Sequence, residues 1–157
     1  MLEVKNIYKT FNPGTINEKI ALNGLSLKLN EGDFVTVIGG NGAGKSTLLN
    51  AVAGVWPVDE GQIVIDGTDV TKLSEHKRAA YLGRVFQDPM TGTAATMGIE
   101  ENLALARRRG TKRGLRKGIT QQEREEYKEL LKVLGLGLEN RLTSKVGLLS
   151  GGQRQAL

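Results

Sequence analysis

The sequence of 157 residues contains no cysteine, which excludes disulfide bonds and thiolate metal sites. Long apolar runs are also absent, because the richest stretch, residues 48–58, is shorter than a membrane span of about eighteen residues and contains Asn50 and Pro57. The first residues alternate polar and apolar side chains, so we expect no secretion signal there. These absences lead us to expect one globular domain, or part of one, that lies in the cytoplasm and does not cross a bilayer.

Aromatic side chains are missing from the most basic segment of the chain. Residues 107–117, RRRGTKRGLRK, hold seven basic side chains and no acidic one, and without them the net charge of +5 falls to about −2. The basic residues are Arg107, Arg108, Arg109, Lys112, Arg113, Arg116 and Lys117. Proteins that bind single-stranded nucleic acids interleave such charges with aromatic rings. We therefore predict that this loop is solvated, faces a membrane or faces a partner, and we expect no specific nucleic-acid binding.

Strand patterns dominate the beginning of the chain. Residues 25–29, LSLKL, alternate leucine with polar side chains, and residues 30–33 supply turn chemistry. The apolar run FVTVI, residues 34–38, follows at once. The pattern predicts a half-buried strand, a turn and a buried strand.

Helices and strands then alternate. A short helix after the glycine-rich loop is predicted to end near Gly54, and Asp66–Gly67 predicts the turn of a hairpin. Ser74–Ala80 fits a short helix that Ser74 caps, with the lone His76 as a solvated residue. Residues 81–87, YLGRVFQ, predict a further strand that closes at Asp88–Pro89.

The pattern becomes helical over residues 98–140 and indicates an insert. Thr120 and Glu123 have the spacing of a capping box, and Gly135 is a natural C-terminal stop. Between them, four side chains are expected on one face of a helix: Tyr127, Leu130, Leu131 and Leu134.

A glycine-rich loop lies between a predicted strand and a predicted helix, and its pattern G-x-x-x-x-G-K-S is that of a phosphate-binding loop. Glycines let backbone N–H groups curl around phosphate oxygens, while the helix start and Lys45 add positive charge. The hydroxyl of Ser46 can bind a Mg²⁺ that bridges the outer phosphates. The alternative is a glycine turn beside a surface lysine. The residues predicted to bind the phosphates are Gly39, Gly40, Asn41, Gly42, Ala43, Gly44, Lys45, Ser46 and Thr47.

A second glycine-containing motif, LLSGGQRQAL, closes the sequence. Ser150 and Gln153 have the spacing of a capping box. The amides of Gly151 and Gly152 at the start of a helix offer a second anion-binding site. This motif alone fits any capped helix equally well.

The two glycine motifs, with a helical insert between them, resemble those of the ATP-binding subunit of ABC transporters. Gln87, in VFQDPM, is similar in position to the glutamine of the family's Q-loop, although an ordinary turn residue would fit there too. Phe11 resembles the aromatic residue that stacks on adenine. Phe11 as a core residue, with Tyr8 as the stacking ring, is the alternative.

The resemblance implies an α/β fold, that of a P-loop NTPase of ABC type, with an N-terminal antiparallel β part and a helical insert. Its parts would be a β and P-loop core over residues 1–97, a helical subdomain over residues 98–150 and the start of the signature helix over residues 150–157. It also implies ATP and Mg²⁺ as ligands, with Ser46 and Gln87 at the metal.

The resemblance further implies a head-to-tail dimer, in which residues 150–153 of one copy close over the ATP that Lys45 and Ser46 of the other copy hold. A membrane permease, and a solute-binding protein in an importer, would be the other partners. The subunit would lie on the inner face of the cell membrane. We expect an ATPase that drives import of a small organic solute; a soluble ABC protein of DNA repair or translation and a nucleotide-binding fragment without catalysis are the alternatives.

The acidic residues that hydrolysis needs are not found after the signature. Residues 63–66, IVID, end an apolar strand in Asp66, but Gly67 follows and favours a hairpin turn. The sequence is therefore interpreted as an N-terminal portion, incomplete at the C-terminus and without a catalytic base. We expect residues 34–38 to lack neighbouring strands, and the isolated portion to be unstable or to oligomerise, with little ATPase activity.

Overall fold

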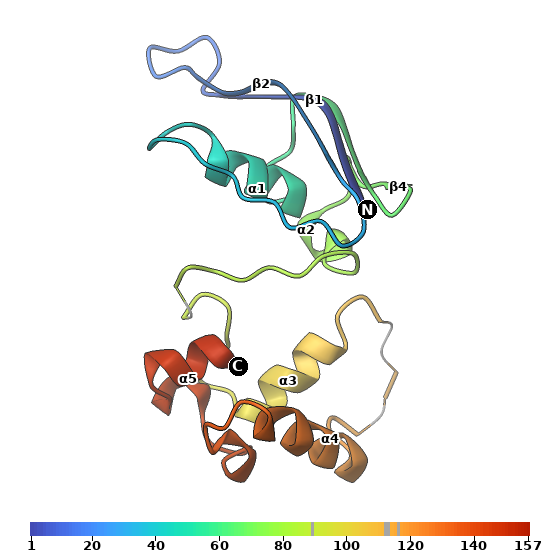
Figure 1. Cartoon of the computed structure of the whole chain (residues 1–157), viewed down its shortest axis with the longest axis vertical. Coiled ribbons are helices and arrows are strands. Elements are labelled where there is room, and N and C mark those ends of the chain that lie inside the picture. The colour runs from blue at the N-terminus through green and yellow to red at the C-terminus, as the bar shows by residue number, and fades with distance from the viewer. Residues whose placement is uncertain (89, 112–113, 116) are drawn as a thin grey trace. The chain divides into compact units, whose positions relative to one another are not determined.

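The computed structural model describes residues 1–88, 90–111, 114–115 and 117–157 (Figure 1). The chain divides into two compact units, Met1–Gly83 and Arg84–Leu157. The first contains a sheet and two helices, and the second contains helices and connecting turns. The division into functional parts at residues 97 and 98 stays a prediction.

The sheet of the first unit has four antiparallel strands in the order β2-β1-β3-β4. Their bounds are β1 Leu2–Phe11, β2 Lys19–Leu29, β3 Glu60–Ile65 and β4 Thr68–Asp69. The predicted strand at residues 25–29 is confirmed as the end of the longer β2. The hairpin at Asp66–Gly67 is also confirmed, since both residues have the positive φ, 47° and 76°, that tight hairpin turns require.

Helix α1, Lys45–Ala53, packs against this sheet and forms the core of the first unit. Its end at Gly54 is as predicted, because Gly54 adopts a left-handed φ of 84°. The buried side chains of the core come from the sheet and from α1: Val4, Ile7, Leu22, Leu48, Ala51, Ile63, Ile65 and Val70.

Arg78 ties the short helix α2, Glu75–Arg78, to the end of α1. Only 1% of Arg78 is exposed, and its guanidinium donates to the carbonyl oxygens of Ala51 at 2.6 Å and Val52 at 3.0 Å. Further bonds go to the carbonyls of Thr71 and Leu73. The predicted helix thus begins after Ser74 but ends at Arg78 instead of Ala80, where the arginine turns toward α1. The predicted side-chain cap is not formed, because the Ser74 hydroxyl lies 3.1 Å from a ring nitrogen of His76 instead. His76 is exposed, as expected.

Two predicted strands are not formed. In the described part of the chain neither residues 34–38 nor residues 81–87 pair with another strand. Phe34 and Ile38 are 92% and 91% exposed, and Val85 is 85% exposed. The buried strand predicted at residues 34–38 is therefore not formed, whereas the expectation that these residues lack neighbouring strands is confirmed. An extended segment needs a partner for its backbone groups, and no described strand pairs with this one. Pro89, the predicted end of the second strand, lies outside the described residues.

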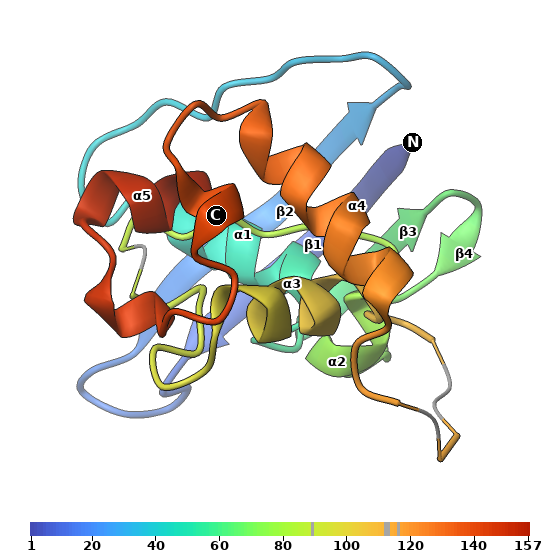
Figure 2. The ribbon, with the colours of Figure 1, turned by 90° about the horizontal axis from the view of Figure 1, so that it is seen from below.

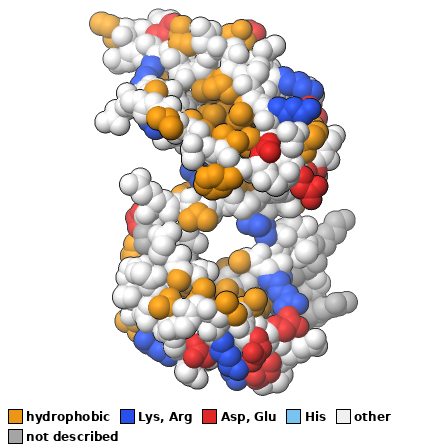
Figure 3. Space-filling model, in the orientation of Figure 1, with side chains coloured by type: hydrophobic (Ala, Val, Ile, Leu, Met, Phe, Trp, Pro, Cys, Tyr) orange, Lys and Arg blue, Asp and Glu red, His pale blue; other side chains and the backbone are white. Residues whose placement is uncertain are grey.

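Hydrophobic side chains are exposed on both units (Figure 3). In the first unit the largest exposed fractions belong to Ile16 and to the ends of the segment at residues 34–38. No helix in the described part of the chain is long and apolar enough to span a membrane.

The second unit is built from α3, Ile99–Arg107, α4, Gln121–Lys132, and α5, Gly151–Ala156 (Figure 2). Two single turns of 3₁₀ helix, Leu138–Asn140 and Val146–Leu148, connect α4 to α5. The buried core is apolar and draws on all of these segments: Ile99, Ala104, Tyr127, Leu131, Leu138, Leu142, Val146 and Leu149.

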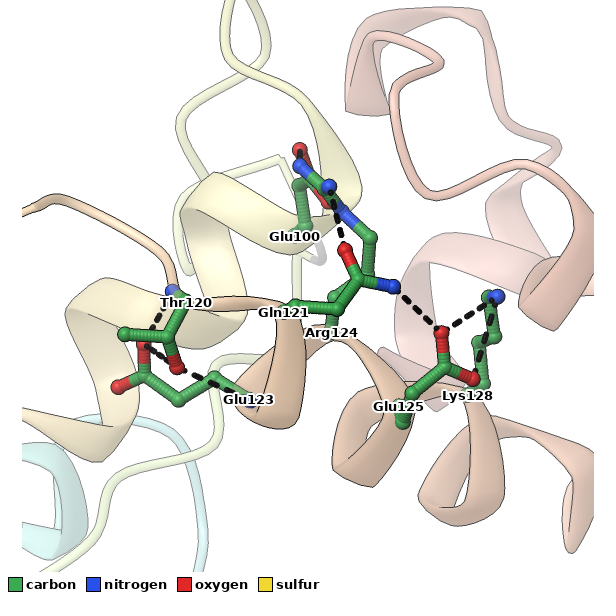
Figure 4. A network of polar contacts seen from close by, with 7 residues as sticks. All are labelled: Glu100, Thr120, Gln121, Glu123, Arg124, Glu125 and Lys128. Carbon is green, nitrogen blue, oxygen red and sulfur yellow. Dashed lines mark hydrogen bonds and ion pairs between the residues drawn. The ribbon is translucent and has the colours of Figure 1, made fainter.

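The start of α4 confirms the capping box predicted at Thr120 and Glu123. The backbone N–H of Glu123 donates to the Thr120 hydroxyl at 3.2 Å, and the backbone N–H of Thr120 donates to the Glu123 carboxylate at 2.8 Å (Figure 4). The predicted apolar face is only half right. Tyr127 and Leu131, one turn apart, are buried, whereas Leu130 is 64% and Leu134 40% exposed, because the described core lies on one narrow side of α4.

Ion pairs join α3 to α4. Arg124 binds Glu100 in a bidentate manner, with its Nε 2.6 Å and its NH2 2.9 Å from the two carboxylate oxygens (Figure 4). These hydrogen bonds lower the pKa of Glu100 below its ordinary value.

The start of the basic segment is also paired with α4. Arg107 pairs with Glu126, and Arg108 with Glu123 at 2.7 Å. Arg107, the last residue of α3, stays exposed, whereas Arg108 is half-buried because α4 brings acidic side chains opposite these two residues. Lys112, Arg113 and Arg116 lie outside the described residues.

Candidate nucleotide-binding site

The glycine-rich loop closes around its own lysine. Lys45, the first residue of α1, donates from Nζ to the carbonyl oxygens of Gly39 at 2.6 Å and Gly40 at 2.7 Å. A turn bond from the N–H of Ala43 to the Gly40 carbonyl, at 3.3 Å, tightens the same loop. The amine is thus held at the mouth of the loop, where an anion at the start of α1 would meet it.

Two glycines of the loop adopt backbone conformations that side chains disfavour. Gly42 has a φ of 81° and Gly44 a φ of 85°. At Gly44 the space is also closed, because a Cβ there would lie 2.5 Å from the carbonyl oxygen of Ala21 in β2. The loop can lie this close to the sheet only because residue 44 has no side chain.

A hollow of about 390 Å³ opens beside the loop. The residues that line it are Phe11, Lys19, Ala21, Asn41, Gly42, Ala43, Gly44, Lys45, Ser46, Thr47 and Trp56. Exposed residues of the loop therefore share one surface with the two aromatic rings of Phe11 and Trp56. A ligand with an anionic part and a flat apolar part suits such a surface.

Phe11 and Trp56 are the aromatic residues that line this hollow, and Tyr8 is not among its lining residues. The Phe11 ring meets the ring of Trp56 edge to face, with centroids 5.0 Å apart and planes at 81°. Tyr8 points instead toward β2, where its hydroxyl lies 2.9 Å from the position that a Cβ on Gly24 would take. Of the two candidate rings, Phe11 is the one at the hollow, and its stacking on adenine stays a prediction.

Sequence reasoning missed Lys19 and Trp56 as residues of the site. Lys19 lies directly opposite Phe11 in the pairing of β1 with β2, so a register worked out for this hairpin could have found it. Trp56 follows α1 after a glycine cap, and no local pattern signals that its ring reaches Phe11.

The second glycine motif begins α5 in the second unit. The N–H of Gln153 donates to the Ser150 hydroxyl at 3.3 Å, and the N–H of Ser150 donates to the Gln153 side-chain oxygen at 3.2 Å, which confirms the capping box. Gly151 and Gly152 are exposed. Gln87 is exposed in the same unit, whereas the glycine-rich loop belongs to the first.

Arg154 is buried behind this motif and donates to the carbonyl of Gly147 at 2.9 Å. A further bond reaches the carbonyl of Val146 at 3.3 Å. Because these bonds fix the inner side of α5, the capped end with its glycine amides is left free at the surface.

The loop fits the phosphates of a nucleotide. Its glycines leave the main-chain amides uncovered, and one lysine amine stands at the start of a nine-residue helix. Ser46 is exposed in the first turn of that helix and offers one oxygen ligand to Mg²⁺. Within the described residues, no group of three or more histidine or acidic side chains is placed to hold a metal ion.

Comparison with known proteins identifies the family. The family model for ABC transporters matches residues 22–157, which include both glycine motifs. The chain belongs to the ABC transporter family. This confirms the P-loop fold of ABC type and its N-terminal antiparallel sheet.

Several relatives within the ABC transporter family cover the whole of this chain. The tyrosine transport ATP-binding protein of Clostridioides difficile is 43% identical over 162 residues, which span 100% of this chain and 62% of that protein. The ATP-binding protein LolD of a lipoprotein-releasing system in Acinetobacter baylyi is 35% identical and is covered to 65%.

Among solved structures, the dimeric structure of the bacterial ABC transporter cassette MJ0796 matches with a TM-score of 0.78 at 31% identity. The match covers 99% of this chain and 66% of that cassette. The chain thus spans about two thirds or less of these relatives and corresponds to part of a nucleotide-binding domain.

Proposed function

We propose that the whole protein binds and hydrolyses ATP with Mg²⁺ and so drives transport across a membrane, as the nucleotide-binding subunit of an ABC transporter. The observation that carries the proposal is the hollow at the start of α1, where Lys45, bare glycine amides and the ring of Phe11 share one surface. Membership of the ABC transporter family supports the same conclusion.

Phosphate binding in this proposal is an exchange of partners. Lys45 gives up its bonds to the carbonyls of Gly39 and Gly40 and donates to phosphate oxygens instead. The amides of residues 39–47 surround the same phosphates, and the positive end of α1 stabilises their charge. Phe11 stacks on the adenine ring, with Trp56 holding it edge-on.

Ser46 would be one ligand of Mg²⁺, and Gln87 a second or a contact of the attacking water. When bound, Mg²⁺ neutralises charge that develops on the outer phosphates. Closure would come from a second copy, whose Ser150 hydroxyl and the amides of Gly151 and Gly152 approach the terminal phosphate. The dimeric cassette among the relatives supports this arrangement.

The general base is proposed to come from outside these 157 residues. Among the described strands, β3 is the apolar strand that an acidic residue follows. That residue, Asp66, turns the hairpin and pairs with the amino group of Met1 at 2.5 Å. The 157-residue chain by itself should therefore show little ATPase activity.

A small organic solute is the proposed cargo, with import as the direction. The relative with 43% identity is named for tyrosine transport, which supports an amino acid. A membrane permease, and a solute-binding protein, would complete such a transporter on the inner face of the membrane.

The test uses the full-length protein, purified alone and with its permease. Calorimetric titration with Mg-ATP should show binding to the wild type and none to Lys45→Ala. Lys45 is the one charged residue of α1, so this variant removes the positive charge that the helix brings to the loop. Lys28→Ala, an exposed lysine of β2 paired with Glu3, is the control and should leave binding unchanged. Failure of the wild type to bind Mg-ATP, or full binding by Lys45→Ala, would contradict the proposal. Uptake of labelled tyrosine by the complex in vesicles tests the cargo separately.

A further inference from the structure

Resting on the proposed function, we propose that Lys19 is a second phosphate-binding amine of this site, which contacts the phosphate nearest the ribose. Lys19 would then raise the affinity for any nucleotide that carries this phosphate, in addition to what the loop and Lys45 contribute. The observation behind it is the juxtaposition of Lys19 with Phe11 on one side and Gly42 on the other.

Strand pairing fixes the position of Lys19. It is the first residue of β2 and the direct antiparallel partner of Phe11, the last residue of β1. Its Nζ lies 3.4 Å from the position that a Cβ on Gly42 would take. The side chain therefore extends from the aromatic wall of the hollow toward the glycine-rich loop.

The amine of Lys19 is also available. Within the described residues it has neither an ion pair nor a hydrogen bond, and Lys19 is exposed. Its neighbours differ in this respect. Lys9 is paired with Asp59 at 2.7 Å, Glu18 accepts the N–H of Gly14, and Lys45 is bound to two carbonyls of its own loop. Three uncommitted N–H donors thus face the hollow from β2.

The order of these groups along the hollow selects the phosphate. The base stacks at Phe11, and the distal phosphates lie at Lys45 and the start of α1. Lys19 stands between these two ends, where the phosphate attached to the ribose has to pass. A lysine suits this task because its charge is compact and its stem is long enough to follow the ligand.

The experiment titrates the full-length protein with Mg-ADP, AMP and adenosine by calorimetry. Lys19→Ala should lower the affinities for both Mg-ADP and AMP about five- to tenfold. This loss lies between the contribution of an exposed ion pair and that of a charge-assisted hydrogen bond. Adenosine, which has no phosphate, should bind as it does to the wild type. Lys19→Arg should stay within about twofold of the wild type, because it keeps the charge.

Matched controls separate this inference from the proposed function. Lys28→Ala removes the same charge from the same strand and should change none of the three affinities. Lys45→Ala should weaken Mg-ADP far more than AMP, since it acts on the distal phosphate. If Lys45→Ala has this effect while Lys19→Ala leaves Mg-ADP and AMP unchanged, the role of Lys19 is wrong and the proposed function stands. A loss confined to Mg-ADP, or an equal loss for adenosine, likewise overturns the contact with the ribose-linked phosphate. If the wild type binds no nucleotide at all, both proposals fail.

Discussion

The ion pair between Glu100 and Arg124 predicts how firmly α3 is held against α4. Glu100 is 7% exposed, and its carboxylate accepts two bonds from Arg124, at 2.6 and 2.9 Å. Its backbone N–H donates to the carbonyl of Leu142, so the residue is fixed on both sides. Arg124→Ala removes the guanidinium and leaves a largely buried carboxylate without its partner.

The magnitude lies between two limits. Removing one partner of a fully buried pair costs about 3–5 kcal/mol, whereas a surface pair contributes about 0–1 kcal/mol. The side chain of Arg124 is 38% exposed, so water can reach part of the vacated site. We expect about 2 kcal/mol, which corresponds to about a thirtyfold increase in local opening.

The effect depends on pH in a defined direction. Because the Arg124 bonds lower the pKa of Glu100 from its ordinary value of 4.5, the stabilisation is complete above pH 4.5 and is lost as the pH falls through the lowered pKa of the folded state. The difference between wild type and Arg124→Ala should therefore be full at pH 7 and should shrink in acid.

Amide hydrogen exchange of the full-length protein measures this opening locally, in peptides from α3 and α4. Lys128→Ala is the matched control, because Lys128 pairs with Glu125 at 3.0 Å on the exposed side of the same helix (Figure 4). It should change opening by less than about 0.5 kcal/mol. Exchange in Arg124→Ala within about threefold of the wild type at pH 7, or an equal effect of Lys128→Ala, would refute the reasoning.

Three other positions give measurable expectations. Gly44→Ala would put a Cβ 2.5 Å from the carbonyl oxygen of Ala21 at a φ of 85°, so Mg-ATP affinity and the melting temperature should both fall. Gly40→Ala is the control, because the space around Gly40 is open, and it should leave the melting temperature unchanged. Hydrogen bonds from Thr71 lower the pKa of Asp69 to about 2. The ionised Asp69 then stabilises the β3–β4 hairpin above pH 3.8, and this stabilisation is lost as the pH falls through about 2. An NMR titration of Asp69 with a midpoint near 3.8 would contradict this. Trp56→Ala removes the edge-to-face partner of Phe11 and should lower the calorimetric affinity for Mg-ADP about two- to tenfold. Trp56→Phe keeps an aromatic ring there and should retain most of the affinity. Equal Mg-ADP affinities of the wild type and both variants would disprove the contribution of this contact.

Features whose cause lies within a few residues could be predicted from the sequence. The capping boxes at Thr120 and Ser150 depend on a side chain and an amide three residues later, and both form as expected. The turn at Asp66–Gly67 depends on two backbone conformations that these residue types tolerate. The folding of the glycine-rich loop around Lys45 is also local, because the glycines and Lys45 lie within a few residues of each other, whereas its binding of phosphate stays a prediction.

Features that depend on distant segments could not be predicted in this way. Apolar composition at residues 34–38 indicates a strand, but a strand forms only beside another strand. The expectation that these residues lack neighbours rests on the resemblance to the family and not on their own composition, and no described strand pairs with them. Leu130 illustrates the same point on a helix, since its exposure depends on what packs beside α4. Lys19 and Trp56 enter the site through strand register and a ring contact, neither of which is local.

The anchoring of Arg78 has a mechanical consequence for α1. With 1% exposure, its guanidinium cannot exchange the carbonyls of Ala51 and Val52 for water. Moving that end of α1 would leave the buried guanidinium without hydrogen-bond acceptors, so the C-terminal end of the helix is held in place. Adjustments that a ligand provokes at the opposite end are then confined to the glycine backbone ahead of Lys45, and the sheet beneath keeps its shape.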